Sequence, residues 1–126
     1  MTDNDITYQI RGAIYDVYKN LGPGLLESVY EEAMSYELGK RGLAVERQLE
    51  IPIHYDGHLL NASLRLDLLV QKRIVVELKS VKELQEVHFM QTRTYLKLLD
   101  LKVGILVNFN TNDILKNGMF RVVNGV

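Results

Sequence analysis

The chain has 126 residues, of which 47% are hydrophobic and 25% are charged. This length and balance predict a single folded domain over residues 1–126, with one real core. The net charge of -1 excludes a strongly basic nucleic-acid coat protein, although an enzyme needs only a local basic rim. Because there is no cysteine, disulfides, thiol nucleophiles and cysteine metal centres are excluded. The polar N-terminus and the lack of a long apolar run predict a cytoplasmic protein without membrane contact.

The first third of the chain has the apolar spacing of two helices. Apolar residues recur every three or four positions from Ile6 to Leu21, and Gly22-Pro23-Gly24 then ends the predicted helix. A second helix is expected from Leu26 to Leu38, with its end near Gly39 to Gly42.

The pattern then changes to the two-residue period of strands. Alternation predicts a strand over Leu49–Tyr55, and Pro52 places that strand at a sheet edge or at a bulge. Asp56-Gly57 predicts a hairpin turn. In the returning strand, alternation puts Leu60 and every second residue through Leu68, Leu66 included, on one face, and Asp67 with its polar neighbours on the other.

The remaining elements complete an α/β pattern. They are a strand over Ile74–Ser80, a helix from about Leu84 to Leu99, a buried strand over Val103–Val107 and a possible edge strand over Gly118–Val123. Strand–helix–strand order across the third helix suggests a parallel pair with a right-handed crossover. The sequence therefore predicts a mixed central sheet flanked by helices.

Two of the predicted strands contain charged residues where apolar ones are usual. Asp67 lies in one strand, while Glu77 and Lys79 share one face of the next. If these strands are neighbours, two carboxylates and an ammonium meet in one small region. Carboxylates with few other protein ligands suit Mg²⁺, and Lys79 would then orient the attacking water or neutralise developing charge.

An alternative interpretation of the same residues is structural. Asp67 or Glu77 would form an internal salt bridge with Lys79 or Arg65, and Asp67→Asn would then destabilise the fold. Basic residues near the proposed site are equally open to two interpretations, because they fit either a phosphate-contacting rim or a solvated surface. These residues are Lys72, Arg73, Lys82, Arg93 and Lys97.

Two further features lie on predicted helices. Gln91 and Tyr95 are four residues apart and therefore share a face, which would either pack in the ordinary way or reach the site. Glu27 lies in the first turn of the second helix, where the helix dipole favours a carboxylate, and Tyr30 fits a core position.

Together these residues resemble a known pattern. Gly24-x-x-Glu27-x-x-Tyr30 is similar to the signature of the GxxExxY protein family, which is placed in the PD-(D/E)XK nuclease superfamily. Asp67 followed by Glu77-Leu78-Lys79 resembles the superfamily's D…ExK core, although Leu66 stands where the motif has proline. Gln91-x-x-x-Tyr95 and Gly24-x-x-Glu27 resemble the QxxxY and GxxE elements of its exonuclease-like branch. The resemblance covers about Ile6 to Asn110.

The resemblance implies a restriction-endonuclease-like αβββαβ core and a metal-dependent nuclease. Phosphodiester bonds, of DNA rather than RNA, would be hydrolysed by water that Mg²⁺ or Mn²⁺ activates. Asp67 and Glu77 would bind the metal with the Leu78 carbonyl and Glu27, and Lys79 would assist the water. Gln91 and Tyr95 would support the site or hold the substrate strand.

A different class of function also fits the sequence. The same fold could serve as a non-catalytic module that binds nucleic acid or a protein partner and works only inside a complex. Edge strands and apolar helix faces permit a homodimer without requiring one.

Overall fold

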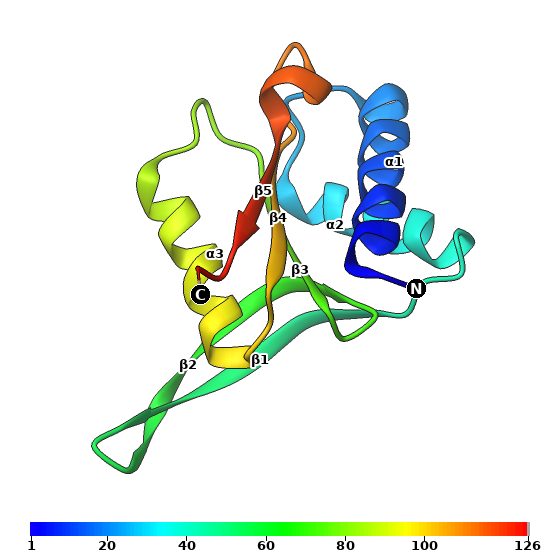
Figure 1. The fold of residues 1–126 in the computed structure, drawn as a ribbon. Helices are drawn as coiled ribbons and strands as arrows, with labels where there is room; N and C mark the ends of the chain where they lie inside the picture. Colours follow the sequence, from blue (N-terminus) through cyan, green and yellow to red (C-terminus); the bar gives the residue numbers. More distant parts are fainter. Residues whose placement is uncertain (126) are drawn as a thin grey trace.

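The computed structural model describes residues 1–125 and shows one mixed sheet of five strands in the order β1-β2-β3-β4-β5 (Figure 1). Neighbouring strands are antiparallel except β3 and β4, which are parallel. The α/β architecture and the parallel pair across the third helix are confirmed. In chain order the elements are α1 (Asp3–Leu21), α2 (Glu27–Lys40), β1 (Val45–Tyr55), β2 (His58–Val70), β3 (Ile74–Lys79), α3 (Glu86–Leu99), β4 (Val103–Asn108), the short π-helix η1 (Ile114–Gly118) and β5 (Met119–Val123).

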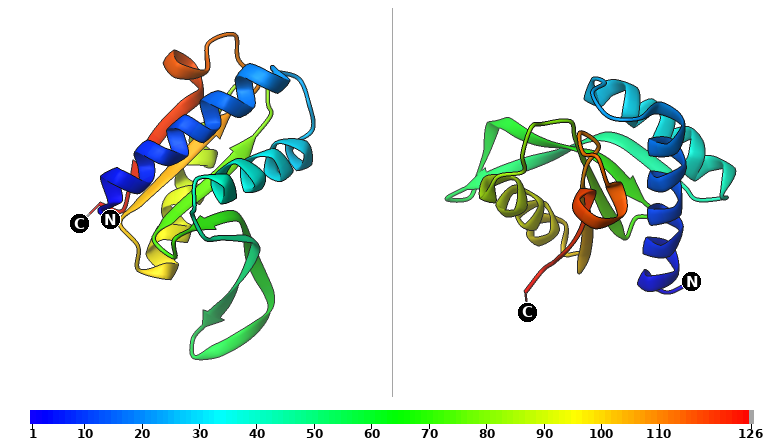
Figure 2. Two further views of the ribbon diagram at one scale, coloured as in Figure 1. Left: turned by 90° about the vertical axis from the view of Figure 1, so that its right-hand side faces the viewer. Right: turned by 90° about the horizontal axis from the view of Figure 1, so that it is seen from above.

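Helices cover both faces of the sheet. Seen from above, α1 and α2 lie on one side of the strands and α3 lies on the other (Figure 2). The larger core packs α1 and α2 against side chains such as Leu68, Val76 and Leu78, and the smaller core packs α3 against Leu66, Leu69 and Val75. Both sheet faces are therefore buried at the centre, which explains the continuous burial of β3 and β4.

Tyr30 fixes the loop between the first two helices. Its ring is fully buried and stacks on Phe109 with 4.2 Å between ring centroids. Its hydroxyl donates a hydrogen bond to the Gly22 carbonyl at 2.6 Å and accepts one from the Leu25 amide at 3.2 Å. Gly22 itself has φ +70°, a conformation that favours glycine. Tyr30 is the core residue that its spacing predicts. Its hydroxyl fixes the loop that leads into α2, and thereby the position of Glu27, the first residue of that helix.

The predicted face alternation along β2 is wrong between Leu66 and Leu68. Leu66 packs in the core beneath α3, whereas Leu68 packs in the core beneath α1 and α2. The partner strand β1 changes face at the same level, because Val45 packs in the core beneath α1 and α2 whereas Leu49 packs in the core beneath α3. Gln48, whose φ is +49°, lies at this level of β1 across from Asp67. A residue in the left-handed region breaks regular alternation, which period counting does not detect.

The far half of the β1–β2 hairpin extends beyond the helices as an arm (Figure 1). The side chains of Tyr55 and Leu59 are 71% and 65% exposed. The β1–β2 register shifts between Pro52 and His54, and β1 is an edge strand, as Pro52 predicts. In residues 1–125 no helix is long and apolar enough to cross a membrane.

Candidate active site

The site lies where β2 and β3 stop pairing. Their ladder runs from Val70 and Ile74 to Leu68 and Val76 and goes no further. Beyond it, the Asp67 amide donates a hydrogen bond to Glu77 Oε2 at 3.0 Å, and the Leu78 amide donates one to Asp67 Oδ2 at 2.8 Å. Side-chain carboxylates thus take the places of backbone carbonyls, so the strands separate without leaving these amides unpaired. The expected approach of Asp67 to Glu77 is confirmed.

Glu77 is the most unusual charged residue in the described chain. Its side chain projects from a strand that is buried on both faces, and the residue is only 3% exposed. Burial, reinforced by the negative charge of Asp67, raises the pKa of Glu77 to about 9. The positive charge of Lys79 opposes this rise. At neutral pH Glu77 therefore holds a proton unless a cation takes that proton's place.

Glu27 approaches the same region from α2. Its carboxylate accepts a hydrogen bond from the Ser80 amide at 3.1 Å, and the Ser80 hydroxyl donates one to the Leu25 carbonyl at 2.6 Å. The beginning of α2 is thereby attached to the end of β3. Glu27, Asp67 and Leu78 line one hollow of about 420 Å³, so the structure brings together three of the four residues expected to bind metal.

Tyr95 and Gln91 lie on the α3 side of Glu77. Tyr95 is 2% exposed and donates a hydrogen bond to the Arg65 carbonyl at 3.1 Å. Burial and the charges of Glu77 and Asp67 raise the pKa of Tyr95 to about 12. The Gln91 side chain is exposed. Tyr95 thus packs in the core and also supports the strand that carries Asp67.

Lys79 is half-buried at the end of β3 and, in residues 1–125, forms no salt bridge. The predicted alternative of a structural salt bridge is wrong for this site. Arg65 pairs with Glu50 at 2.8 Å, and no cation within salt-bridge distance neutralises Asp67 or Glu77 among the described residues. Of the basic residues that fit either a phosphate-contacting rim or a solvated surface, Arg73 pairs with Asp3 at 2.5 Å.

Three lining residues, Ser28, Glu31 and Gln48, escaped the sequence analysis. Glu31 follows Glu27 by four residues, so helical spacing on α2 is the signal that would have indicated it. Arg47 binds the Glu31 carboxylate at 2.9 Å and Glu32 at 2.8 Å. Gln48 lies 3.4 Å from Asp67 Oδ1 and also contacts Glu31. Gln48 has no signal in sequence, because its position depends on the left-handed turn in β1.

The donor set fits a divalent cation of the magnesium type. Such ions take carboxylate and carbonyl oxygens, and they commonly use only one or two carboxylates with waters and substrate phosphate. Asp67, Glu77 and the Leu78 carbonyl provide oxygens of this kind. In residues 1–125 no group of three or more histidine, aspartate or glutamate side chains is gathered tightly enough to hold a metal alone. The site therefore fits an ion that is held jointly by protein, water and substrate.

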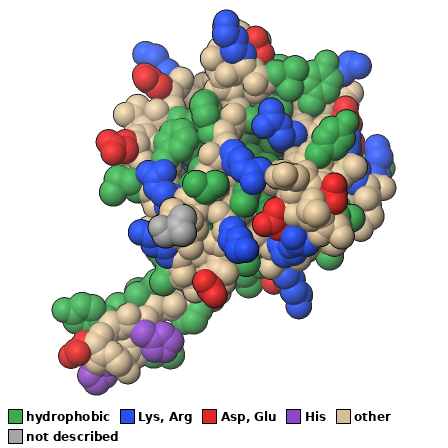
Figure 3. Space-filling model, viewed as in Figure 1, with side chains coloured by type: hydrophobic (Ala, Val, Ile, Leu, Met, Phe, Trp, Pro, Cys, Tyr) green, Lys and Arg blue, Asp and Glu red, His purple; other side chains and the backbone are tan. Residues whose placement is uncertain are grey.

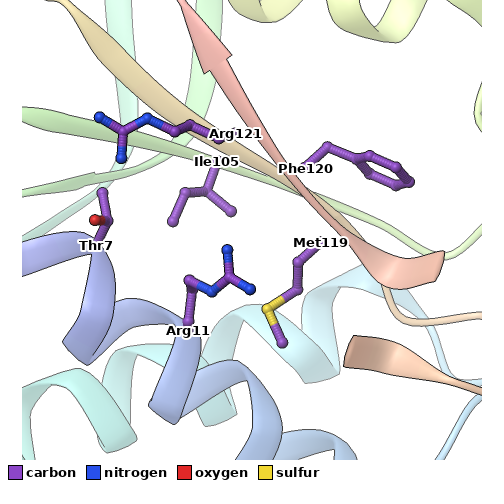
Figure 4. A pocket seen from close by; sticks show the side chains of 6 residues that line it. All are labelled: Thr7, Arg11, Ile105, Met119, Phe120 and Arg121. Carbon is purple, nitrogen blue, oxygen red and sulfur yellow. The ribbon is translucent and has the colours of Figure 1, made fainter. Parts of the chain in front are cut away.

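A smaller hollow on the α1 side differs in character (Figure 4). Arg11 from α1 and Arg121 from β5 lie on either side of Ile105, and the space has a volume of about 40 Å³. That volume holds a few water molecules at most. Among residues 1–125 no carboxylate lines the hollow, so the described lining offers no metal ligands of the Asp67 and Glu77 kind.

Comparison with known proteins places the chain in a class. Residues 4–122 match the PD-(D/E)XK nuclease superfamily, and the chain belongs to that superfamily. Nucleases of this superfamily generally use divalent metal ions and act on nucleic acid, and the sheet with its flanking helices agrees with their restriction-endonuclease-like fold.

A solved protein shares the fold at low sequence identity. The chain is similar to the crystal structure of SSO0001, with 25% identity and a TM-score of 0.59, over 79% of this chain and 50% of that one. The chain thus spans about half the length of that protein. No curated protein matches the sequence closely enough to count as a relative.

Proposed function

We propose that this protein is a divalent-metal-dependent nuclease that hydrolyses phosphodiester bonds of DNA. The observation that carries the proposal is the pair Asp67 and Glu77, which is held in contact where two strands separate, with Glu77 buried and no cation paired to either carboxylate in residues 1–125. A protein gains no stability from such a pair, and a site that must bind a cation requires it.

Each site residue has a role that its position supports. Asp67, Glu77 and the Leu78 carbonyl would hold Mg²⁺ or Mn²⁺, and Glu27 would complete the binding shell from across the hollow. When bound, the ion would supply Lewis-acid polarisation of the phosphate and a more acidic water. Lys79 would orient the attacking water and offset charge that develops on the phosphate oxygens.

Gln91 and Tyr95 complete the proposed site from α3. Tyr95 would hold β2 in place through its bond to the Arg65 carbonyl, two residues before Asp67. The exposed Gln91 amide would be available to a phosphate or sugar of the substrate strand. We further propose that the chain belongs to the GxxExxY group, on the basis of Gly24, Glu27 and the loop-fixing role of Tyr30.

The proposal is tested by cleavage of single-stranded, duplex and nicked DNA, and of RNA, with Mg²⁺ or Mn²⁺. Lys79→Ala and Asp67→Asn should abolish cutting, while Lys40→Ala, which removes an exposed lysine outside the site, should leave it unchanged. Metal-dependent cutting that survives both site substitutions would refute the assignment. Nucleic-acid binding without any cleavage would favour the non-catalytic module instead.

A further inference from the structure

A second large hollow lies beyond the segment that follows β3. Its volume is about 420 Å³, within the range of about 300–1,000 Å³ that is usual for small-molecule sites. Hydrophobic side chains reach the surface of this face between α3 and β5 (Figure 3). The lining residues come from the β3–α3 loop, α3, the β4–η1 region and β5: Lys82, Glu83, Leu84, Phe89, Asn108, Asn110, Thr111, Asn117 and Phe120.

Aromatic rings and amides dominate this lining. Phe89 and Phe120 form an edge-to-face pair with 5.5 Å between centroids, and both remain half-buried rather than covered. The exposed Asn117 side chain makes no hydrogen bond within residues 1–125, so its donor and acceptor are available. The one lysine and one glutamate of the lining leave it without net charge. This surface is unsuited to a free phosphate or a metal ion and suits a flat, uncharged heterocycle with polar edges.

The hollow is joined to the candidate active site by a short, tightly held segment. The buried Asn108 side chain accepts a hydrogen bond from the Val81 amide at 3.1 Å and donates one to the Val81 carbonyl at 2.9 Å. On one side of Val81, Ser80 binds Glu27, and on the other side Lys82 lines the hollow. Two residues of chain span at most about 7 Å, so the Lys82 edge of the hollow lies close to the Ser80–Glu27 contact of the candidate active site.

We propose that this hollow binds one unstacked base of a single-stranded nucleic acid, next to the phosphate held at the active site. The proposal rests on the nuclease function proposed above and specifies its substrate as a single strand or a frayed end. Phe89 and Phe120 provide the stacking surface, Asn117 contacts the base edge, and Lys82 lies near the following phosphate. A base inside an intact duplex is stacked and paired, so it cannot enter such a hollow without being extruded.

The test measures binding without cleavage. Fluorescence anisotropy of labelled short single strands in EDTA, at low salt, compares wild type with Phe120→Leu and with Tyr36→Leu. Tyr36 is 69% exposed on α2 and lies outside the hollow, so it controls for loss of an aromatic ring. Phe120→Leu should weaken binding about tenfold, the scale of one lost stacking contact, and Tyr36→Leu should not.

A set of strands with a single abasic position identifies the base in the hollow. At one position, loss of the base should weaken wild-type binding about tenfold and should remove the difference between wild type and Phe120→Leu. Equal sensitivity of both proteins at every abasic position would overturn the proposal. DNA and RNA versions of the strand show which sugar is preferred.

Two checks show whether a negative result comes from an unfolded variant or from an error in the nuclease proposal. Thermal unfolding shows whether Phe120→Leu is folded. If it is not, Asn117→Ala, a change at an exposed residue, replaces it in the test and should weaken binding several-fold. Cutting by wild type together with unchanged binding by both variants would leave the nuclease intact and refute the base site. Base-dependent binding without cutting would support the base site and count against the nuclease. If no single strand binds, the base site is refuted.

Discussion

Two acidic groups each contribute one carboxylate, Glu31 or Asp67, to the lining of the same hollow, and their surroundings differ. On α2, Glu31 and Glu32 share the guanidinium of Arg47, with distances of 2.9 and 2.8 Å. On the sheet, Asp67 and Glu77 contact each other's strand and have no cation in the described chain within salt-bridge distance. The first group is an ion network that a cation neutralises, and the second keeps unbalanced negative charge. The comparison teaches that missing neutralisation, rather than the number of carboxylates, indicates where a cation belongs.

Pairing with Arg47 has the expected electrostatic effect on the first group. It lowers the pKa of Glu32, whereas burial and Asp67 raise the pKa of Glu77. The same chemical group therefore shifts in opposite directions in two places of one small domain. Substitutions in the two groups should have opposite effects on stability and unequal effects on activity.

The largest expected effect is on catalysis. Glu77→Gln keeps the size of the side chain and an acceptor for the Asp67 amide but removes the charge, so metal-dependent cleavage should fall at least about 100-fold. The matched change Glu32→Gln, in the neutralised group, should leave the rate within about twofold. Rates of strand cleavage under saturating Mn²⁺ provide the comparison, and similar losses in both variants would contradict it.

Metal binding should be the next largest effect. At a Mn²⁺ concentration about 100 times the dissociation constant, wild type should gain about 2.7 kcal/mol of stability. Because the pKa of Glu77 is about 9 and a ligand must lose its proton, Mn²⁺ affinity should increase from pH 6 to pH 9. Differential scanning fluorimetry with and without Mn²⁺ measures the gain. A gain of equal size in Glu77→Gln would place the metal elsewhere.

Without metal, the same substitution should stabilise the protein. The pKa of Glu77 is raised from an unfolded value near 4.5 to about 9, so the folded state binds the proton more tightly. Stability of wild type therefore falls as pH rises between these values, and the fall is complete above the folded value. Glu77→Gln should be more stable by roughly 1–2 kcal/mol at pH 8 and by little at pH 5. Urea unfolding in EDTA at both pH values tests this, and destabilisation at pH 8 would show that the charge is structurally neutralised.

The smallest effect should come from the neutralised group. Arg47→Met leaves the exposed Glu32 and the largely covered Glu31 without their cation, and it should cost on the order of 1 kcal/mol. Because the pair is at the surface, the cost should shrink further in high salt. Urea unfolding at low and high salt measures both effects. A loss larger than that seen for core substitutions would mean that Arg47 also holds Gln48 and the bend of β1.

Residues with local signals were predictable from sequence. The periodicity between Ile6 and Val123 indicates all the helices and strands except η1. Because Asp67 and Glu77 lie on strands predicted to be neighbours, their proximity could also be predicted. The sheet face on which Leu66 lies was predicted wrongly. It depends on the left-handed backbone conformation of Gln48, which the alternation of apolar and polar residues does not reveal. The pairing of Phe89 with Phe120 and the position of Glu31 depend on how helices pack on the sheet, which no single segment of sequence determines.

The projecting β1–β2 arm has a consequence for how this protein can change over evolutionary time. Its tip at Asp56-Gly57 lies beyond the helices, and its outermost residues pair with each other, Tyr55 with His58 and His54 with Leu59. Insertions at an exposed hairpin tip cost little closure entropy and disturb no buried neighbour. Variants of this fold can therefore lengthen or shorten the arm freely, while the spacing of Asp67, Glu77 and Lys79 stays the same. The arm is the part of the domain in which new contacts can be gained without altering the chemistry at its centre.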